Sequence, residues 1–487
     1  MNFKDLSLEE LILKIKNSEN TKEEIFSYFL QRIKKYDDKV QSFNFVNEDG
    51  LNIEANKDSI LAGVPIAVKD IFCEIGIPTT CSSKMLENFK PPFDSTVIKK
   101  LKEAGFSSLG KVTMDEFAMG STNETSALKK AVNPWGTNRI PGGSSGGSAA
   151  SVAAGLAPAA LGTDTGGSIR QPASMCNLVG FKPSYGRNSR NGVIAMASSL
   201  DCPGTLTKTV KDSALLYEIM NGNDPLENTS LPGKDIIDPK IWETKDLKGY
   251  KIGVPKEYFE EGLDSGVRKT IEDAIEKLKE LGAEIKEISL PMTKYAIATY
   301  YIIMPAEVST NLSRYDGIRY GHNSNSPYES TDELFINNRT EAFGKEQKRR
   351  IILGSYVLSA GFYDAYYKKA TQVRTLIIKD FDKAFEEVDA IVSPVCPSVA
   401  WKIGEKIDDP LKMYLADAYT IPASLAGLPG ISVPAGFAES EDEEKELLPV
   451  GLQILTPRLE EQRLFEIANV FEKATNYGKQ NPKGFED

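Results

Sequence analysis

The chain has 487 residues, 41% of them hydrophobic and 26% charged, which is the composition of a globular protein with a large core. Because 69 acidic residues outnumber 58 basic ones, the net charge of −11 argues against a chain that holds nucleic acid by its own electrostatic field. No apolar run approaches the ~18 residues of a membrane span, and Met1–Glu10 lacks the apolar core of a signal peptide, so we expect a cytoplasmic protein without membrane contact.

Two helices are predicted near the N-terminus. Ser7–Glu10 and Thr21–Glu24 both have the capping-box pattern, in which a Ser or Thr is followed three residues later by Glu, and apolar residues at helical spacing follow each of them. A strand is expected at Phe43–Val46. We therefore expect residues 1–60 to pack as N-terminal helices on a core made of residues 61–487.

The core begins with a short apolar strand that ends at a lysine. Val64–Val68 has the continuous apolar character of a buried strand, and burial of the next residue, Lys69, would favour its neutral amine. A lone lysine at a strand end is more often a solvated charge. Lys69 becomes a candidate base only because of the turns that follow, after a helix predicted at Thr96–Ala104 and a polar loop.

Two turns rich in Gly and Ser flank a short apolar helix. The first reads Pro-Gly-Gly-Ser-Ser-Gly-Gly-Ser at Pro141–Ser148, the second reads Gly-Thr-Asp-Thr-Gly-Gly-Ser-Ile-Arg at Gly162–Arg170, and the helix begins at Ala149. Paired glycines let a ligand approach the backbone amides, and the serines present hydroxyls on the same turns. A phosphate-binding loop would need a lysine after the glycines, and a flexible linker would not enclose an apolar helix. The turns therefore predict a catalytic site.

A serine nucleophile needs a group that takes its proton. The one histidine, His322, stands in a polar stretch that predicts a surface loop. The five cysteines are scattered without a C-x-x-C pair, so we expect neither disulfides nor a metal site. The scarcity of histidine points to the Ser-Lys hydrolases, with Ser168 or Ser144 as nucleophile and Lys69 as base.

The remaining chain predicts an α/β fold. Strands are expected at 179–182 and 192–195, with a helix that is capped by Asp212 and runs to Met220. A strand at 251–255, a helix to Leu281 and a strand at 283–290 indicate a parallel crossover. A mostly helical region at 292–388 follows, then strands near 390–392, 431–433 and 450–455 and a C-terminal helix after Arg463. Although ~150 residues per domain would allow about three domains, we expect a single large domain with a mixed central sheet covered on both faces by helices.

Taken together, the Lys69 strand and the two turns resemble the amidase signature family. Ser144 follows Lys69 by 75 positions and Ser168 follows Ser144 by 24, which is similar to the spacing of that family. The resemblance implies an amidase-signature domain at 61–487 with its catalytic core at 61–215. It implies a Ser-cisSer-Lys triad in which Ser168 attacks, Ser144 shuttles the proton and neutral Lys69 is the base. It also implies an oxyanion hole made by the backbone N–H groups of Thr165, Gly166, Gly167 and Ser168.

Further segments extend the resemblance over nearly the whole chain. They are Tyr300–Glu307, Ser313–Gly317, Lys348–Ile351, Tyr363–Tyr367 and Asp417–Pro434. These segments resemble the glutamine-hydrolysing A subunits of bacterial aspartyl/glutamyl-tRNA amidotransferases. One departure is Cys202-Pro203-Gly204-Thr205, where such subunits usually read Gln-x-Gly-Pro; it concerns the loop there and none of the triad.

The resemblance implies a pocket for glutamine within residues 290–435. Arg350 would bind the α-carboxylate, for which the planar fork of arginine is suited, and Asp417 would bind the α-ammonium. Arg349 is the alternative partner of the carboxylate, because adjacent residues on a helix face different ways. The pocket wall is assigned to Tyr301 and to the backbone of Met119, Gly120 and Ser121.

The resemblance also implies partners. This chain would hold no cofactor, and a B subunit would use ATP and Mg²⁺ to activate Glu on tRNA(Gln), with Asp on tRNA(Asn) left open as a second substrate. A small C subunit would complete a heterotrimer in which the B subunit holds most of the tRNA. A stand-alone amidase on another small primary amide would share the triad without needing Arg350 and Asp417. A catalytically silent scaffold would be expected to have lost the triad, which this chain retains.

Overall fold

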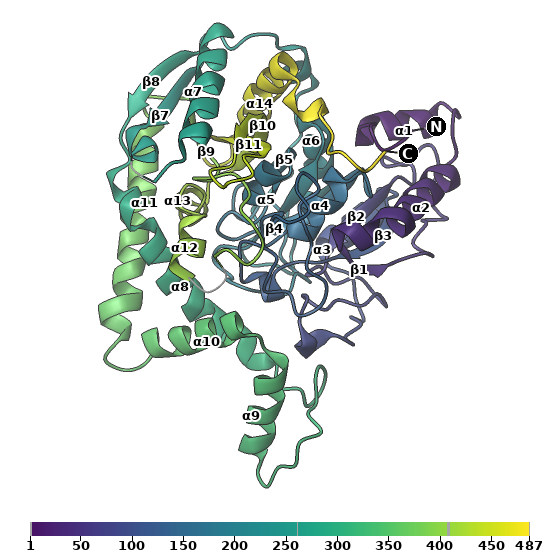
Figure 1. Ribbon diagram of the computed structural model, residues 1–487, viewed down its shortest axis with the longest axis vertical. Coiled ribbons are helices and arrows are strands. Elements are labelled where there is room, and N and C mark those ends of the chain that lie inside the picture. Colours follow the sequence, from purple (N-terminus) through teal and green to yellow (C-terminus); the bar gives the residue numbers. More distant parts are fainter. Residues whose placement is uncertain (1, 261, 407–409, 487) are drawn as a thin grey trace.

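The computed structural model describes residues 2–260, 262–406 and 410–486. Within these residues the strands form a single mixed sheet of eleven, in the order β1-β3-β2-β4-β6-β5-β10-β11-β9-β7-β8 (Figure 1). The strands are β1 Phe43–Val46, β2 Pro65–Lys69, β3 Ser107–Val112, β4 Ala159–Asp164, β5 Val179–Lys182, β6 Cys202–Thr207, β7 Lys251–Pro255, β8 Glu284–Ile288, β9 Ala390–Pro394, β10 Gly430–Glu439 and β11 Leu447–Leu455. The predicted single α/β domain, with helices on both faces of a mixed sheet, is confirmed.

Helices lie between many of these strands, four of them, α8 to α11, follow one another between β8 and β9, and α9 projects furthest from the sheet (Figure 1). The helices are α1 Leu8–Lys16, α2 Lys22–Val40, α3 Thr96–Glu103, α4 Gly146–Ala153, α5 Arg170–Met175, α6 Val210–Met220, α7 Ser265–Glu280, α8 Ala296–Asn311, α9 Thr331–Ala342, α10 Lys345–Val357, α11 Lys369–Ala384, α12 Pro410–Leu415, α13 Ile421–Ala426 and α14 Glu461–Thr475. Among the described residues, no helix combines the length and apolar character needed to cross a membrane.

The N-terminal segment is tied to the core at several points. Both predicted capping boxes are present, with Ser7 and Thr21 as the caps of α1 and α2. The strand that follows, β1, pairs antiparallel with β3 at the edge of the main sheet. Arg32 of α2 donates a hydrogen bond of 2.8 Å to the carbonyl of Phe485, which brings the C-terminal end of the chain beside the N-terminal helices (Figure 1). The boundary at residue 60 stays a prediction.

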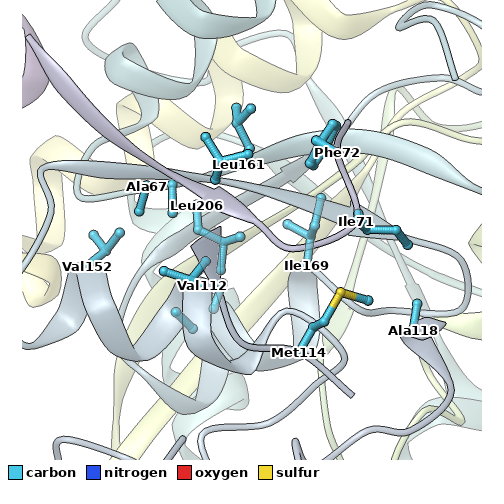
Figure 2. Close-up of a cluster of buried hydrophobic side chains, with 14 of the residues drawn as sticks. Ala67, Ile71, Phe72, Val112, Met114, Ala118, Val152, Leu161, Ile169 and Leu206 are labelled. Carbon is cyan, nitrogen blue, oxygen red and sulfur yellow. The ribbon is translucent and has the colours of Figure 1, made fainter. Parts of the chain in front are cut away.

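The core around the two Gly/Ser turns is apolar and closely packed. Figure 2 shows Ala67 of β2, Leu161 of β4 and Val152 of α4 in one buried cluster. Helix α4 is buried at every residue, and a Cβ at Gly147 would lie 2.4 Å from the carbonyl oxygen of Thr113. The Gly, Ser and Ala composition of α4 therefore lets the helix lie against the end of the sheet, where a bulkier helix would not fit.

Two sequence-based expectations about elements were wrong, and two strands were missed. The strand predicted at 192–195 is reduced to one bridge between Phe72 and Val193, because Gly192 turns the chain at φ +76°. Strands β3 and β6 were not predicted, since their polar and Gly-containing sequences hide the fact that every residue is buried. Helix α6 begins at Val210 with Thr209 as its cap, and the Asp212 carboxylate instead accepts hydrogen bonds from the first amides of α1.

Candidate active site

Strands β2 and β4 are parallel neighbours, and Lys69 and the two Gly/Ser turns lie together where these strands end. Lys69 is the last residue of β2, and its Nζ lies 2.8 Å from Ser144 Oγ, 2.8 Å from Ser145 Oγ and 2.9 Å from Thr163 Oγ1. Ser144 and Ser145 belong to the first turn, and Thr163 lies at the end of β4. The predicted neighbours Lys69 and Ser144 are therefore in direct contact.

The surroundings of Lys69 favour its neutral form. Burial lowers its pKa to about 7, and the nearby carboxylates of Asp115, Asp164 and Asp201 offset only part of that effect. A neutral amine has two N–H donors and one lone pair. The hydroxyl oxygens of Ser145 and Thr163 can accept from the two donors, which leaves the lone pair to accept the proton of Ser144.

The first turn contains a cis peptide bond between Gly143 and Ser144 and is held by two polar partners. The Asp115 amide donates to the Ser144 carbonyl at 3.1 Å, and the Gly143 amide donates to Gln171 Oε1 at 2.8 Å. Gln171 Nε2 in turn donates to the Ser121 carbonyl at 2.8 Å. Gln171 thus connects the first turn to the loop predicted to line the substrate pocket.

Ser168 lies in the second turn, next to the Lys69–Ser144 pair. The Ser145 amide donates to the Ser168 carbonyl at 3.2 Å, which joins the two turns. Ser168 is 8% exposed, whereas Lys69 and Ser144 are fully buried, so Ser168 is the member of the predicted triad that solvent reaches. Its hydroxyl makes no hydrogen bond to any residue that the structure describes, the Ser144 hydroxyl included.

The backbone around Ser168 has the features of an anion-binding turn. None of the amides of Thr165, Gly166, Gly167 and Ser168 donates a hydrogen bond within the described part of the chain. Thr420 Oγ1 donates to the Gly166 carbonyl at 2.6 Å and so fixes the opposite side of that peptide. A Cβ at Gly166 would lie 2.8 Å from the ring of Tyr300, and one at Gly167 would lie 2.2 Å from Thr420 Oγ1. Only glycine fits at these two positions.

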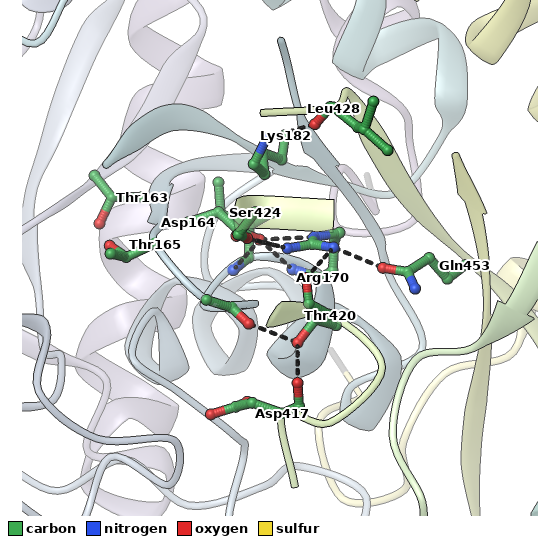
Figure 3. A network of polar contacts seen from close by, with 12 residues as sticks. Thr163, Asp164, Thr165, Arg170, Lys182, Asp417, Thr420, Ser424, Leu428 and Gln453 are labelled. Carbon is green, nitrogen blue, oxygen red and sulfur yellow. Dashed lines mark hydrogen bonds and ion pairs between the residues drawn. The ribbon is translucent and has the colours of Figure 1, made fainter. Parts of the chain in front are cut away.

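A buried ion pair holds the second turn in place (Figure 3). Arg170 donates to both oxygens of Asp164, at 3.0 Å from Nε and 2.8 Å from Nη2, and both side chains are fully buried. Burial alone would raise the pKa of Asp164, but the Arg170 guanidinium holds that pKa below its ordinary value. Arg170 also donates to the Thr420 carbonyl and to Gln453 Oε1. Both oxygens of Asp164 therefore accept hydrogen bonds from Arg170, and Asp164 stabilises the second turn.

At the predicted substrate end, the two adjacent arginines of α10 face different ways. The side chain of Arg350 is 3% exposed and donates from Nε to Glu346 Oε1 at 2.7 Å, whereas the side chain of Arg349 is 49% exposed and pairs with Glu346 Oε2. The guanidinium of Arg350 lies 5.5 Å from the ring centre of Tyr301. Arg350 is the buried cation, and Arg349 lies on the outer face of the helix.

Asp417 is buried beside the loop that contains Ser121. Ser121 Oγ donates to Asp417 Oδ2. Burial raises the pKa of Asp417 to about 7, and the Ser121 hydrogen bond and the charge of Arg350 act against that rise. Phe117 and Ala118 at φ +49° and +61° turn the loop toward this region. The structure therefore brings Ser121 and Asp417 into contact and places the charge of Arg350 close enough to affect the Asp417 carboxylate.

Several residues of this region were not predicted from the sequence. They are Asp115, Ser145, Thr163, Gln171, Glu346 and Tyr414. Ser145 and Thr163 lie inside the two Gly/Ser turns and Gln171 directly follows the second one, and this position is the one signal that could have pointed to them. The others are joined to the site by contacts between distant parts of the chain.

The fold and this Lys-Ser arrangement define an amide hydrolase, and the chain belongs to the amidase family, whose family model matches residues 24–465. The chain is similar to the A subunit of the glutamyl-tRNA(Gln) amidotransferase of Nitrosococcus oceani, with 49% identity over 98% of this chain and 99% of the relative. It is similar to the crystal structure of the Thermotoga maritima protein of the same name, with a TM-score of 0.83 at 42% identity over 99% of this chain and 98% of that one. The peptide amidase of Stenotrophomonas maltophilia is a more distant structural relative, with a TM-score of 0.79 at 26% identity over 99% of each chain. The family resemblance drawn from the sequence is confirmed, and the chain is an amidase-family enzyme.

Proposed function

We propose that this chain is the glutaminase component of a tRNA-dependent amidotransferase and hydrolyses the side-chain amide of glutamine. The observation that carries the proposal is the pair of buried opposite charges, Arg350 and Asp417, in the same structure as the buried Lys69–Ser144 pair. A free α-amino acid carries one carboxylate and one ammonium, for which a buried cation and a buried carboxylate are complementary partners. A simple apolar amide would need neither charge.

The first chemical step follows from the Lys69 contacts. Ser168 Oγ attacks the side-chain amide carbon of glutamine, its proton passes to Ser144 Oγ, and the Ser144 proton passes to Nζ of Lys69. The oxygen of the tetrahedral intermediate accepts hydrogen bonds from the free amides at 165–168. One such donor typically contributes about 10²–10³ in rate.

The second half of the reaction returns the proton. Lys69 gives it back through Ser144 to the amide nitrogen, the carbon–nitrogen bond breaks, and ammonia leaves. Ser168 then carries a γ-glutamyl ester. Water attacks that ester with the same residues taking its proton, and glutamate and the free Ser168 hydroxyl are released.

The names of the relatives support a place for this chain in a larger enzyme. A partner B subunit would use ATP and Mg²⁺ to activate the glutamate side chain on tRNA(Gln), and ammonia from this chain would complete the amide. A small C subunit would join the two. The acidic charge of this chain fits an assembly in which the partner holds the tRNA.

The direct test measures ammonia released from L-glutamine, L-asparagine and butyramide by this chain alone and co-purified with its partner subunits. We expect glutamine to be preferred, and its hydrolysis to rise with the partners and glutamyl-tRNA(Gln). Equal or faster hydrolysis of butyramide by the isolated chain would contradict the proposal and indicate a general amidase.

Arg350→Gln and Arg349→Gln form a matched pair on one helix. We expect R350Q to raise the KM for glutamine roughly 10- to 100-fold, the size of a lost hydrogen bond to a charged partner. R349Q should change KM by less than about threefold, because half-exposed ion pairs contribute little. Steady-state ammonia release measures both, and the reverse order would assign the carboxylate to Arg349.

The pH dependence of hydrolysis should differ between glutamine and butyramide. Lys69 works as a base in its neutral form, so with its pKa of about 7 the value of kcat/KM should fall about tenfold per pH unit below 7 for both substrates. Asp417, whose pKa is also about 7, binds ammonium only when it is ionised. The kcat/KM for glutamine should therefore fall by a further factor of up to about ten per pH unit below 7. Equal slopes for the two substrates would show that Asp417 does not bind the ammonium group.

A further inference from the structure

One buried carboxylate joins the two arginines of α10 to the segment that contains Asp417. Glu346 accepts hydrogen bonds from Nε of Arg350 at 2.7 Å, from Arg349 and from the hydroxyl of Tyr414 at 2.9 Å. Burial opposes the charge of Glu346, but Arg350 keeps its pKa below the ordinary value, so the carboxylate is ionised. Both oxygens of Glu346 are therefore occupied by donors of this chain.

Tyr414 continues this connection toward Asp417. Its ring stacks on the ring of Tyr301, with centroids 3.7 Å apart and an angle of 21° between the planes. The amide of Asp417 donates to the carbonyl of Tyr414 at 3.3 Å. The position of Tyr414 therefore fixes the backbone of Asp417, while its hydroxyl is fixed by the carboxylate that also fixes Arg350.

The contacts of Glu346 also decide which edge of Arg350 is free. Nε is occupied by Glu346, and Nη1 lies 3.7 Å from the sulfur of Met304. Nη2 has no hydrogen-bond partner among the described residues. A guanidinium held at Nε cannot rotate freely about its last bonds, so the free edge keeps one direction without a substrate present.

We infer that Glu346 and Tyr414 are positioning residues that set the distance between Arg350 and Asp417 and so favour amides that carry both an α-carboxylate and an α-ammonium, as glutamine does. This inference rests on the proposed glutaminase function and adds two residues that need not touch the substrate. The inference explains why the buried Glu346 carboxylate accepts hydrogen bonds from three donors. A simple ion pair with Arg350 would need only one of them.

The test uses the complex with its partner subunits and compares Glu346→Gln, Tyr414→Phe and the control Glu341→Gln. Glu341 lies at the end of α9 and, among the described residues, its carboxylate bonds to the loop residues His322, Ser324 and Ser326. We expect E346Q to raise the KM for L-glutamine about tenfold with kcat within about threefold of the parent, because the reacting groups are untouched. Y414F, which keeps the ring stack, should raise KM about threefold, and E341Q should change neither constant.

Selectivity provides a second measurement. The preference for L-glutamine over butyramide, which lacks the α-carboxylate and the α-ammonium, should fall several-fold in E346Q. A loss of kcat for both substrates, or an unchanged KM in E346Q and Y414F, would overturn the inference and leave Glu346 as a structural residue. Absence of glutamine hydrolysis by the parent complex would overturn the proposed function itself, and the two failures are thus distinguishable.

Discussion

Replacing Lys69 by methionine is expected to lower glutamine hydrolysis by about 10⁴-fold or more, because the chain then has no base for Ser144. Methionine has a similar length and no charge, so it suits a fully buried site at the end of β2. The hydroxyls of Ser144, Ser145 and Thr163 would remain in place but lose their common partner. Arginine would be a poorer replacement, because it stays charged and cannot accept a proton.

Lys111→Met is the matched control for this prediction. Lys111 is also fully buried, lies near the end of the neighbouring strand β3 and donates to the Phe72 carbonyl. Its loss should reduce stability in urea unfolding, since a buried acceptor is left unpaired, with little effect on kcat of the folded enzyme. If K69M kept more than about 1% of the parent rate while ammonia release remained linear in enzyme, Lys69 would not be the base.

The pairing of Lys69 with Ser144 came from the resemblance to the amidase signature family, supported by two patterns around these residues. The apolar run of β2 predicts a strand that ends at Lys69, and the Gly/Ser composition of the turn predicts a backbone that closely approaches its neighbours. Both features are local. The structure adds that β2 and β4 are parallel neighbours, which is why the end of each strand contributes to the same cluster of polar side chains.

Local patterns failed where packing between distant segments decides the outcome. Strand β6 contains Pro203 and Gly204 yet lies inside the sheet, because β4 and β5 pair with it on either side. Which of Arg349 and Arg350 is buried also depends on packing. A Cβ added at Gly354 of α10 would lie 1.9 Å from the carbonyl oxygen of Pro305 in α8, so the two helices are in close contact at this glycine. This close approach sets which face of α10 points inward. No sequence motif in α8 or α10 predicts which face of α10 points inward.

The supporting polar residues were missed for a related reason. Asp115, Gln171, Glu346 and Tyr414 are common residue types, and some of the contacts that join them to the site come from far away in the sequence, as with the Tyr414 hydroxyl and Glu346. A single sequence gives no sign that a carboxylate is buried or that it accepts three hydrogen bonds. Such residues become visible only when the fold places their donors around them.

Ser168→Ala should lower glutamine hydrolysis by at least about 10⁴-fold while leaving the binding of glutamine intact. Ser168 provides the attacking oxygen, whereas the proposed contacts to the α-carboxylate and α-ammonium come from Arg350 and Asp417. The removed hydroxyl makes no hydrogen bond within the described residues, so the fold should not change. Titration calorimetry of S168A with L-glutamine should therefore give a Kd within about threefold of the Kd measured for the product, L-glutamate, with the parent enzyme.

Ser144→Ala separates the two serines that the sequence left as alternative nucleophiles. If Ser168 is the nucleophile, a γ-glutamyl ester should still accumulate slowly on S144A and be detected by mass spectrometry on the peptide containing Ser168, because only the proton relay is lost. If Ser144 is the nucleophile, the ester should instead be found on the peptide containing Ser144 in S168A. The first outcome agrees with the 8% exposure of Ser168 and the complete burial of Ser144, because a substrate reaches the more accessible residue first. The second outcome would make Ser168 the proton relay and would require the substrate to reach the buried Ser144 beside Lys69.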